Sequence, residues 1–554
     1  MRKLLLFLTL FSLCLTRTGA QELGANYNEN IGQPITEIQM LRDAGISWVR
    51  GFINVHSEFL EVENNVIVGV DENAIRTSSL SRQFMAAKAS LGDGVKFMLS
   101  LKIPFGEDDG LVPETGSEAC EHIFTAVRML LESFDMGKNI SLLVMGNEPM
   151  WENWNADLQD DDAEDYKAFL NEFANRLAQW KAEEGWTFEV FAGSLNRISE
   201  VDRPTIQAVM DVVNSNPNVD GLDLHLHCLN VRQAENDLRL ARERYKVTKK
   251  LICTEFSMVR NLEGEGGTDH RTQNIGAWGI SHGYSSTMKL WEYLDMTVQN
   301  AKAGNPVSYD EFKSLFESFS WYPDNWFTTF YNAFKTYDTY AITGRFSVVP
   351  NSDIYNFSPS YAADTRLWEL GAVYIPKLLG FKEDGSYVPN PLVYPDFIAA
   401  KNGMPVEKVI EGQREILLVL GEGASKDCSV KVESDGVTDE VEMGDGFVLI
   451  EDLKPATSYT VSLTDAGNKT IWSREITTDA LHGSFPLLKF ADAGGHTYIR
   501  IENLSDDVVS YRLLIDGQPA EPVSGAREGN VLSAEITYSD GSVETISTDL
   551  KQMR

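Results

Sequence analysis

Short apolar runs alternate with longer amphipathic stretches from residue 21 to about residue 385. Such alternation is typical of repeated β-α units, whose strands form a parallel sheet. The pattern predicts eight strands, a number that lets the sheet close into a barrel with helices outside it. The predicted strands cover 23–27, 47–53, 95–102, 141–147, 188–194, 221–227, 251–255 and 340–347.

Helical periodicity fills the gaps between these strands. Predicted helices cover 35–44, 119–134, 165–184, 203–214 and 234–245, and a last helix over 365–379 is expected to complete the circle. Two connections, 104–118 and 257–312, are longer than loop statistics favour. The second contains Trp278, and we expect it to form a lid or wall over one end of the barrel.

Beyond residue 385 the pattern changes to short alternating strands separated by turn residues. The segment 414–478, with Tyr459 in Lys-Pro-Ala-Thr-Ser-Tyr-Thr-Val, resembles a fibronectin type III-like sandwich. A second β unit follows from residue 481. The sequence therefore predicts a leader over 1–20, a (β/α)8 barrel over 21–385, and two β-sandwich domains over 386–480 and 481–554.

The first twenty residues have the pattern of a secretory signal peptide. Arg2 and Lys3 precede the apolar run 4–15, and Thr18-Gly19-Ala20 offers small residues for cleavage. This predicts a secreted, periplasmic or cell-surface protein of a bacterium, with a lipid anchor on Cys14 as an alternative. No later apolar run is long enough for a transmembrane helix.

Charge and cysteine spacing exclude several classes of partner. The formal net charge is −34. Removal of the leader would delete Arg2, Lys3 and Arg17 and change the net charge to −37. Because so acidic a surface repels phosphate backbones, nucleic acid is excluded as a partner. The later cysteines lack metal-ligand spacing and are expected to be buried thiols: Cys120, Cys228, Cys253 and Cys428. No metal and no other cofactor is predicted, and the oligomeric state is left open.

Two of the predicted strands end in a glutamate. Glu148 follows the strand 141–147, and Glu255 ends the strand 251–255. Because the carboxyl ends of all strands meet at one end of such a barrel, we expect the two carboxyls to face each other there. Two facing carboxyls are the minimum requirement for cleaving a glycosidic bond.

Alternation along a strand predicts which other side chains point into the barrel. Asp223, His225 and His227 share one face of their strand, and the intervening leucines share the other. We therefore expect the polar face to line the interior. The same rule predicts that Cys253 and Glu255 both point inward.

These residues resemble the retaining glycoside hydrolases of clan A. The matching segments, in the order of that clan, are Trp48-Val49-Arg50-Gly51, Asn147-Glu148-Pro149, Asp220 followed by His225-x-His227, and Thr254-Glu255-Phe256-Ser257. The resemblance covers about 23–379. Two departures are His227, where the clan has a tyrosine, and the lack of a clear tryptophan at the end of the eighth predicted strand.

The resemblance implies a role for each matching residue. Glu148 would be the general acid/base and Glu255 the nucleophile, with Arg50 favouring the ionised form of Glu255. Asn147 would bond the sugar hydroxyl next to the reacting carbon. His225 and His227 would orient the substrate or a carboxylate, or His225 could be an ordinary core histidine.

Aromatic residues near the motifs suggest sugar-stacking surfaces. Trp151 and Trp154 follow Glu148 closely, and Trp278 lies in the long connection. The layout of one barrel and two sandwiches resembles the agarases and porphyranases of family 86, which implies endo-action on a polysaccharide.

Other functions stay open at this point. An exo-β-glycosidase, glucanase, mannanase or xylanase of the same clan would fit the motifs, as would a carbohydrate-binding surface protein without turnover. A metalloenzyme using His225 and His227 is disfavoured because the sequence offers no obvious third ligand.

Overall fold

The computed structural model describes residues 22–27, 38–106, 110–153, 163–258, 260–261, 270–323, 325–346, 368–376, 387–402, 405–421, 423–424, 427–434, 437–441, 446–468, 470–481, 486–493, 496–527 and 529–549. The chain folds as two compact units, of which the first ends at Ile398 and the second begins at Ala399. Across these ranges, no helix is both long and apolar enough to span a bilayer.

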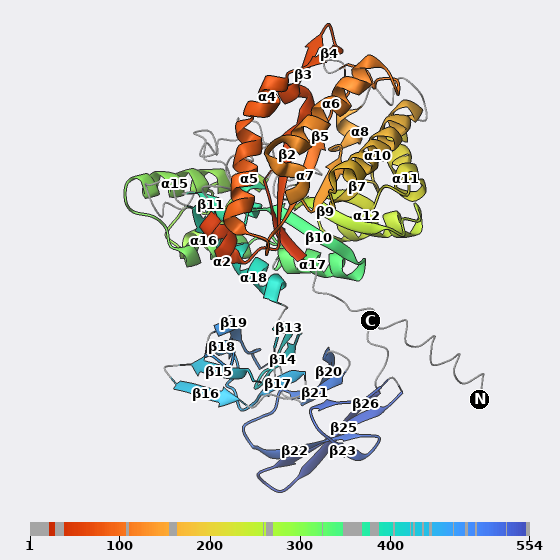
Figure 1. The fold of residues 1–554 in the computed structure, drawn as a ribbon. Coiled ribbons are helices and arrows are strands. Elements are labelled where there is room, and N and C mark those ends of the chain that lie inside the picture. Colours follow the sequence, from red (N-terminus) through yellow and green to blue (C-terminus); the bar gives the residue numbers. More distant parts are fainter. Residues whose placement is uncertain are drawn as a thin grey trace, which may run out of the picture. The chain divides into compact units, whose positions relative to one another are not determined.

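The first unit is a closed barrel of eight parallel strands with helices around it, as the sequence predicted (Figure 1). In chain order the strands are β1 (Glu22–Asn26), β2 (Trp48–Asn54), β5 (Lys96–Lys102), β6 (Leu142–Met145), β7 (Glu189–Asn196), β8 (Gly221–His227), β9 (Lys250–Ser257) and β10 (Thr339–Arg345). Each strand pairs with its neighbours in sequence order, and β10 pairs with β1 to close the ring.

The connecting helices lie outside the barrel. They are α2 (Ile38–Ala44), α4 (Glu72–Thr77), α5 (Ser79–Leu91), α6 (Glu118–Glu132), α7 (Met136–Asn139), α10 (Glu164–Glu184), α11 (Pro204–Ser215), α12 (Val231–Glu243) and α17 (Trp326–Thr336). The helices predicted over 119–134, 165–184, 203–214 and 234–245 correspond to α6, α10, α11 and α12. Their apolar positions recur at helical spacing, and that face is buried.

An apolar layer fills the barrel interior below the carboxyl ends of the strands. It consists of Trp48, Met98, Leu142, Val144, Phe191, Ile252 and Ala341. These side chains come from six strands and alternate with outward-facing residues, as strand geometry requires. The polar side chains that follow on the same inward faces, such as Arg50 after Trp48, therefore lie above a packed core at the carboxyl ends of the strands.

The predicted helix over 365–379 is wrong. The described part of this segment contains a short 3-10 turn (Trp368–Gly371) and β11 (Tyr374–Pro376), which pairs with β12 (Tyr387–Pro389). Gly371 and Pro376 disfavour a continuous helix here because glycine loosens a helix and proline lacks an N–H. A helix that the pattern missed, α18 (Tyr394–Asn402), follows, and the rings of Phe397 and Phe327 on α17 are 5.2 Å apart.

The sequence pattern missed one insertion and the internal helices of another. A hairpin of β3 (Leu60–Glu63) and β4 (Val66–Val70) follows the short helix α3 (Val55–Phe59) after β2. The long connection after β9 forms helices of its own, namely α14 (Gly276–Ser281), α15 (Leu290–Lys302) and α16 (Tyr309–Glu317), before α17 returns to the barrel. The described part of this connection is thus a small helical subdomain, and its position as a lid over the barrel end stays a prediction.

The second unit is built of antiparallel sheets that form two sandwiches. The first has a sheet of β13 (Val406–Glu411), β14 (Ile416–Leu420) and β17 (Phe447–Ile450), and a sheet of β15 (Ser429–Ser434), β16 (Val437–Val441), β18 (Ser458–Thr464) and β19 (Thr470–Thr477). One apolar core joins these two sheets. The Tyr459 hydroxyl accepts a hydrogen bond from the Lys454 N–H at 2.8 Å, as in a tyrosine corner.

The second sandwich follows the same plan. Its sheets consist of β20 (Leu487–Ala493), β21 (His496–Glu502) and β24 (Val523–Ser524), and of β22 (Val508–Ile515), β23 (Gln518–Ala520), β25 (Val531–Tyr538) and β26 (Val543–Asp549). Tyr498 packs against Ile410 and Leu417 of the first sandwich. The Gln413 side chain also bonds Asn503 at 3.0 Å, so a hydrogen bond reinforces the packing between the two sandwiches.

Strand β7 contains an irregularity that matters for the site. Its pairing with β8 shifts between Ala192 and Leu195. Gly193 in this bulge has φ +129°, and a Cβ atom there would lie 2.5 Å from the carbonyl oxygen of Asp223. Only glycine fits, because a side chain would meet both backbone strain and a neighbouring strand.

We predict that Gly193→Ala lowers the free energy of unfolding of the barrel by at least about 1–3 kcal/mol, the usual cost of such strain. Gly94→Ala is the matched control, since a Cβ at Gly94 meets nothing within 4 Å. Urea unfolding followed by barrel tryptophan fluorescence measures both. Equal stability of the two variants would contradict the constraint at Gly193.

Candidate active site

A β-bulge on β9 directs Glu255 into the barrel. Leu224 on β8 pairs with Cys253, but the next residue, His225, pairs with Glu255, so Thr254 is the extra residue. Before the bulge, Ile252 points inward and Cys253 lies opposite the outward-facing Leu224. The expectation that Cys253 points inward is therefore wrong. Glu255 points inward because the bulge reverses the alternation, a device often found beside active sites.

Glu148 is held in an uncommon backbone conformation just beyond β6. Its φ and ψ are 35° and 53°, the left-handed region, and Pro149 begins the short helix α8 (Pro149–Glu152) directly after it. The Glu148 carbonyl accepts the Trp151 and Glu152 N–H groups at 2.8 and 3.0 Å. Strain of this kind persists only where the surrounding structure fixes it, and it is frequent at functional sites.

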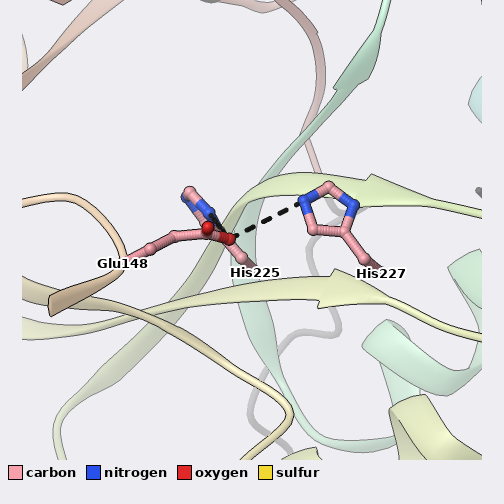
Figure 2. A group of neighbouring side chains, drawn as sticks. All are labelled: Glu148, His225 and His227. Carbon is pink, nitrogen blue, oxygen red and sulfur yellow. Dashed lines mark hydrogen bonds and ion pairs between the residues drawn. The ribbon is translucent and has the colours of Figure 1, made fainter. Parts of the chain in front are cut away.

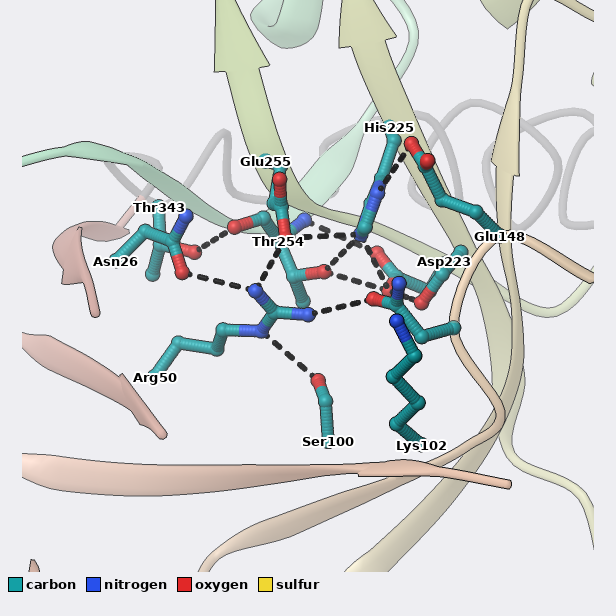
Figure 3. Close-up of polar contacts among 12 residues, drawn as sticks. Asn26, Arg50, Ser100, Lys102, Glu148, Asp223, His225, Thr254, Glu255 and Thr343 are labelled. Carbon is teal, nitrogen blue, oxygen red and sulfur yellow. Dashed lines mark hydrogen bonds and ion pairs between the residues drawn. The ribbon is translucent and has the colours of Figure 1, made fainter. Parts of the chain in front are cut away.

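Arg50 is the centre of the polar network in Figure 3. Its side chain is fully buried. Nη1 lies 2.5 Å from Oε1 of Glu255. Nη1 also donates to Asn26 at 2.9 Å, Nε donates to Ser100 at 2.9 Å, and Nη2 donates to Asn147 at 3.2 Å. Its partners come from β1, β5, β9 and the end of β6, so the barrel itself fixes the guanidinium and Glu255.

His225 lies between the two glutamates and is also fully buried. Its Nε2 is 3.0 Å from the Thr254 hydroxyl, which donates its own proton to Asp223 at 2.6 Å. The Thr254 oxygen must therefore accept from Nε2–H. Nδ1 of His225 is 3.1 Å from Oε1 of Glu148, and this contact needs a proton on one of the two atoms. The pair thus shares one proton.

His227 and Asn196 complete the surroundings of Glu148. Asn196 donates to Oε1 of Glu148 at 2.9 Å. Nε2 of His227 is 3.9 Å from Oε1 of Glu148 and 3.4 Å from Oε2 of Glu255. Since both contacts share one nitrogen, these two carboxylate oxygens are at most about 7.3 Å apart. This bound includes the retaining separation of about 5 to 5.5 Å and excludes the inverting separations above it, within their range of about 6.5 to 9.5 Å.

The charges inside this cluster shift its titrations. Burial would raise the pKa of Glu255, but the charges of His225 and Arg50 and a hydrogen bond from His227 hold that pKa well below its usual range. Burial likewise opposes ionisation of Glu148, yet His225 and His227 lower its pKa, while the Glu255 charge raises it. Burial lowers the pKa of His225, but Glu255, Glu148 and Asp223 raise it overall. The resting site therefore favours two carboxylates and an imidazolium.

The structure separates Asp223, which lies in β8, from Asp220, which lies just before it. Asp223 is buried beside the site and accepts hydrogen bonds from Ser194 at 2.6 Å and from the Thr254 N–H at 3.0 Å. Asp220, the residue matched by resemblance, instead bonds the Val190 N–H near the start of β7. It therefore lies at the end of the barrel opposite the glutamates. Asp223 is the aspartate that supports His225 through Thr254.

The tryptophans predicted to stack on sugar differ in their exposure to solvent. Trp151 on α8 is 36% exposed, and the guanidinium carbons of Arg197 and Arg203 lie 5.0 and 5.3 Å from its ring centroid. Trp278 is buried, stacks on His282 at 4.1 Å and bonds Ser314. Packing within the helical subdomain, rather than contact with a sugar, accounts for the position of Trp278. Trp154 lies outside the described residues.

Sequence reasoning missed a further carboxylate beside the site, that of Glu152. Glu152 on α8 accepts from Asn147 at 3.0 Å and pairs with Lys102 at the end of β5 at 2.8 Å. Burial raises the pKa of Glu152 despite these partners. The spacing in the sequence could have revealed Glu152, because it lies one helical turn after Glu148. No sequence signal could have revealed Asn196, because the irregularity in β7 changes the alternation that would predict its inward orientation.

The four cysteines that the structure describes are buried thiols, as expected: Cys120, Cys228, Cys253 and Cys428.

Comparison with known proteins yields only distant likenesses. No family model and no curated protein sequence matches the chain. Solved structures with a similar fold include a family 39 glycoside hydrolase from Bacteroides cellulosilyticus (10% identity, TM-score 0.42, covering 84% of this chain and 82% of that one). A β-glucuronidase from Parabacteroides merdae (10%, TM-score 0.38, 96% and 61%) and a β-glycosidase from Thermosphaera aggregans (10%, TM-score 0.38, 69% and 96%) are also similar.

The chain spans less than two thirds of the length of the Parabacteroides merdae protein. At these identities and TM-scores, the likenesses do not assign the chain to a family.

We predict that Arg50→Met destabilises the barrel by about 3–5 kcal/mol at pH 7, because Glu255 would remain buried without its cation. The folded-state pKa of Glu255 lies below its unfolded value, so its stabilising effect is complete above the unfolded pKa and is lost as pH falls through the folded pKa. The difference between wild type and variant should therefore narrow below about pH 4.3, the ordinary glutamate pKa.

Arg239→Met, which removes an exposed ion pair with Glu243 on α12, is the control and should change little. Thermal unfolding at pH 7 and at pH 3.5 measures both variants. An Arg50→Met loss that is as small as the control's, or that grows in acid, would contradict the role of the pair.

Proposed function

We propose that this chain is a retaining β-glycoside hydrolase that works by double displacement. Glu255 is the nucleophile and Glu148 the general acid/base. The observation that carries the proposal is the contact of both carboxylates with Nε2 of His227, which keeps their oxygens within about 7.3 Å. This upper bound is compatible with the separation of about 5 to 5.5 Å at which one carboxylate attacks the anomeric carbon while the other reaches the glycosidic oxygen.

In the first step, an oxygen of Glu255 bonds to the anomeric carbon as the glycosidic bond breaks. The proton held between Glu148 and His225 moves through Glu148 to the leaving oxygen. Arg50 keeps Glu255 ionised and aligned for the attack. Asn147, held by Arg50 and Glu152, is placed to bond the sugar hydroxyl next to the reacting carbon.

In the second step, water attacks the anomeric carbon and the bond to Glu255 breaks. Glu148 accepts the proton of the water. The charge pattern supports this change of role, because the negative charge of Glu255 raises the pKa of Glu148 and disappears when Glu255 is esterified by the sugar. Glu148 is then more acidic and is ionised, as a base must be.

The substrate we propose is a polysaccharide outside the cell, cleaved internally. The leader-like residues 1–20 and the two sandwiches after the barrel support this reading. Agarans and porphyrans are the first polymers to test, as the resemblance to family 86 suggests, followed by β-glucan, β-mannan and xylan. Arg197 and Arg203 beside Trp151 would suit an anionic substituent on such a polymer.

Glu255→Gln is predicted to lower reducing-end release from the cleaved polymer by at least about 10⁴-fold, because the nucleophile is lost. Glu243→Gln on the exposed face of α12 is the matched control and should leave the rate unchanged. Reducing-sugar assays on the polymer panel measure both. Background-level release from every polymer by wild type would instead support a binding protein without turnover.

Glu148→Gln is predicted to depend on the leaving group. Cleavage of the natural polymer should fall by about 10² to 10⁴-fold, because its leaving alcohol needs a proton. The first step on a dinitrophenyl glycoside of the same sugar needs none, so the burst of dinitrophenol should persist. Stopped-flow absorbance measures the burst, and its loss in Glu148→Gln would contradict the acid/base role.

A further inference from the structure

Three side chains of the site place metal-binding atoms around one point. Glu148, His225 and His227 each offer a ligand atom, and these atoms lie within 4.8 Å of one another (Figure 2). Oε1 of Glu148 is 3.1 Å from Nδ1 of His225 and 3.9 Å from Nε2 of His227. Ligands of a tetrahedral zinc ion, each about 2.1 Å from the metal, lie about 3.4 Å apart, so both separations from Glu148 are already within about 0.5 Å of that value.

The outer nitrogens of both imidazoles are already held by hydroxyl groups. Nε2 of His225 contacts the Thr254 hydroxyl, and Nδ1 of His227 is 2.8 Å from the Ser257 hydroxyl. These contacts fix the rings so that the remaining nitrogens face Glu148. Metal-binding histidines in proteins usually have such partners, which orient the ring and select the tautomer.

Glu255 lies beside this cluster but is not one of the three groups whose ligand atoms surround the point. Its Oε1 is bound by Arg50, while Oε2 lies 3.4 Å from Nε2 of His227. Two imidazoles and one carboxylate suit borderline divalent ions such as Zn²⁺, Co²⁺, Ni²⁺ and Cu²⁺ better than Mg²⁺ or Ca²⁺, which prefer oxygen alone. The third ligand that the sequence did not reveal comes from a different strand, at the end of β6.

We propose that this cluster binds one divalent transition-metal ion, such as Zn²⁺, and that the bound ion inhibits the enzyme. The ion would replace the proton shared by Glu148 and His225 and occupy the oxygen that must protonate the leaving group. Inhibition would be reversible and would compete with substrate. The binding stands on the geometry of the cluster alone, whereas the inhibition rests on the proposed hydrolase function.

The test uses the full chain after treatment with a chelator and dialysis. Titration with Co²⁺ should produce a visible d–d absorption band that saturates near one equivalent per chain, and Zn²⁺ should abolish the band. His227→Gln should weaken Zn²⁺ binding by at least about 100-fold in calorimetry, as expected for a lost ligand. His496→Gln, which removes an exposed histidine of the second unit, should bind within about twofold of wild type.

The outcomes separate the two proposals. Absence of the Co²⁺ band, or equal Zn²⁺ affinity in wild type and His227→Gln when both melt cooperatively, would overturn the metal site. Glycan cleavage that Zn²⁺ does not slow would overturn the inhibition and leave the hydrolase intact. Site-specific metal binding with no cleavage of any glycan would support the metal site and contradict the proposed function. Activity lost on chelation and restored by Zn²⁺ would contradict the inhibitory role.

Discussion

The buried ion pair between Arg50 and Glu255 is the constraint on which the site depends. Neither charge can be left alone at this depth without a large cost, so each fixes the other. The guanidinium also bonds Asn26, Ser100 and Asn147, which belong to separate strands or strand ends. The closed barrel therefore fixes the position of Glu255, and this position does not depend on a bound sugar.

A second constraint is the shared proton of Glu148 and His225. Thr254 and Asp223 fix the protonation of the far side of the imidazole, so the near side must either donate to Glu148 or accept from it. This arrangement stores the proton that a leaving group needs within a cluster that otherwise favours carboxylates. It also explains how a carboxyl with a lowered pKa can still serve as an acid: the pair, rather than Glu148 alone, holds the proton.

The sequence predicted the barrel well because its strands are recognisable as apolar runs between amphipathic helices. It also predicted that Glu148 and Glu255 meet, because parallel strands bring their carboxyl ends together. The bulge at Thr254 could not be foreseen, since strict alternation puts Cys253 and Glu255 on the same face. The irregularity at Gly193 hid Ser194 and Asn196 for the same reason. The helix expected over 365–379 failed because helical spacing outweighed Gly371 and Pro376 in the prediction.

The stereochemistry of the first product tests the central claim most directly. Proton NMR of a freshly cleaved β-linked oligosaccharide, recorded before mutarotation, distinguishes the two anomers of the new reducing end. Double displacement through Glu255 predicts that the β anomer appears first and the α anomer only later. Immediate appearance of the α anomer would show direct attack by water and contradict the account.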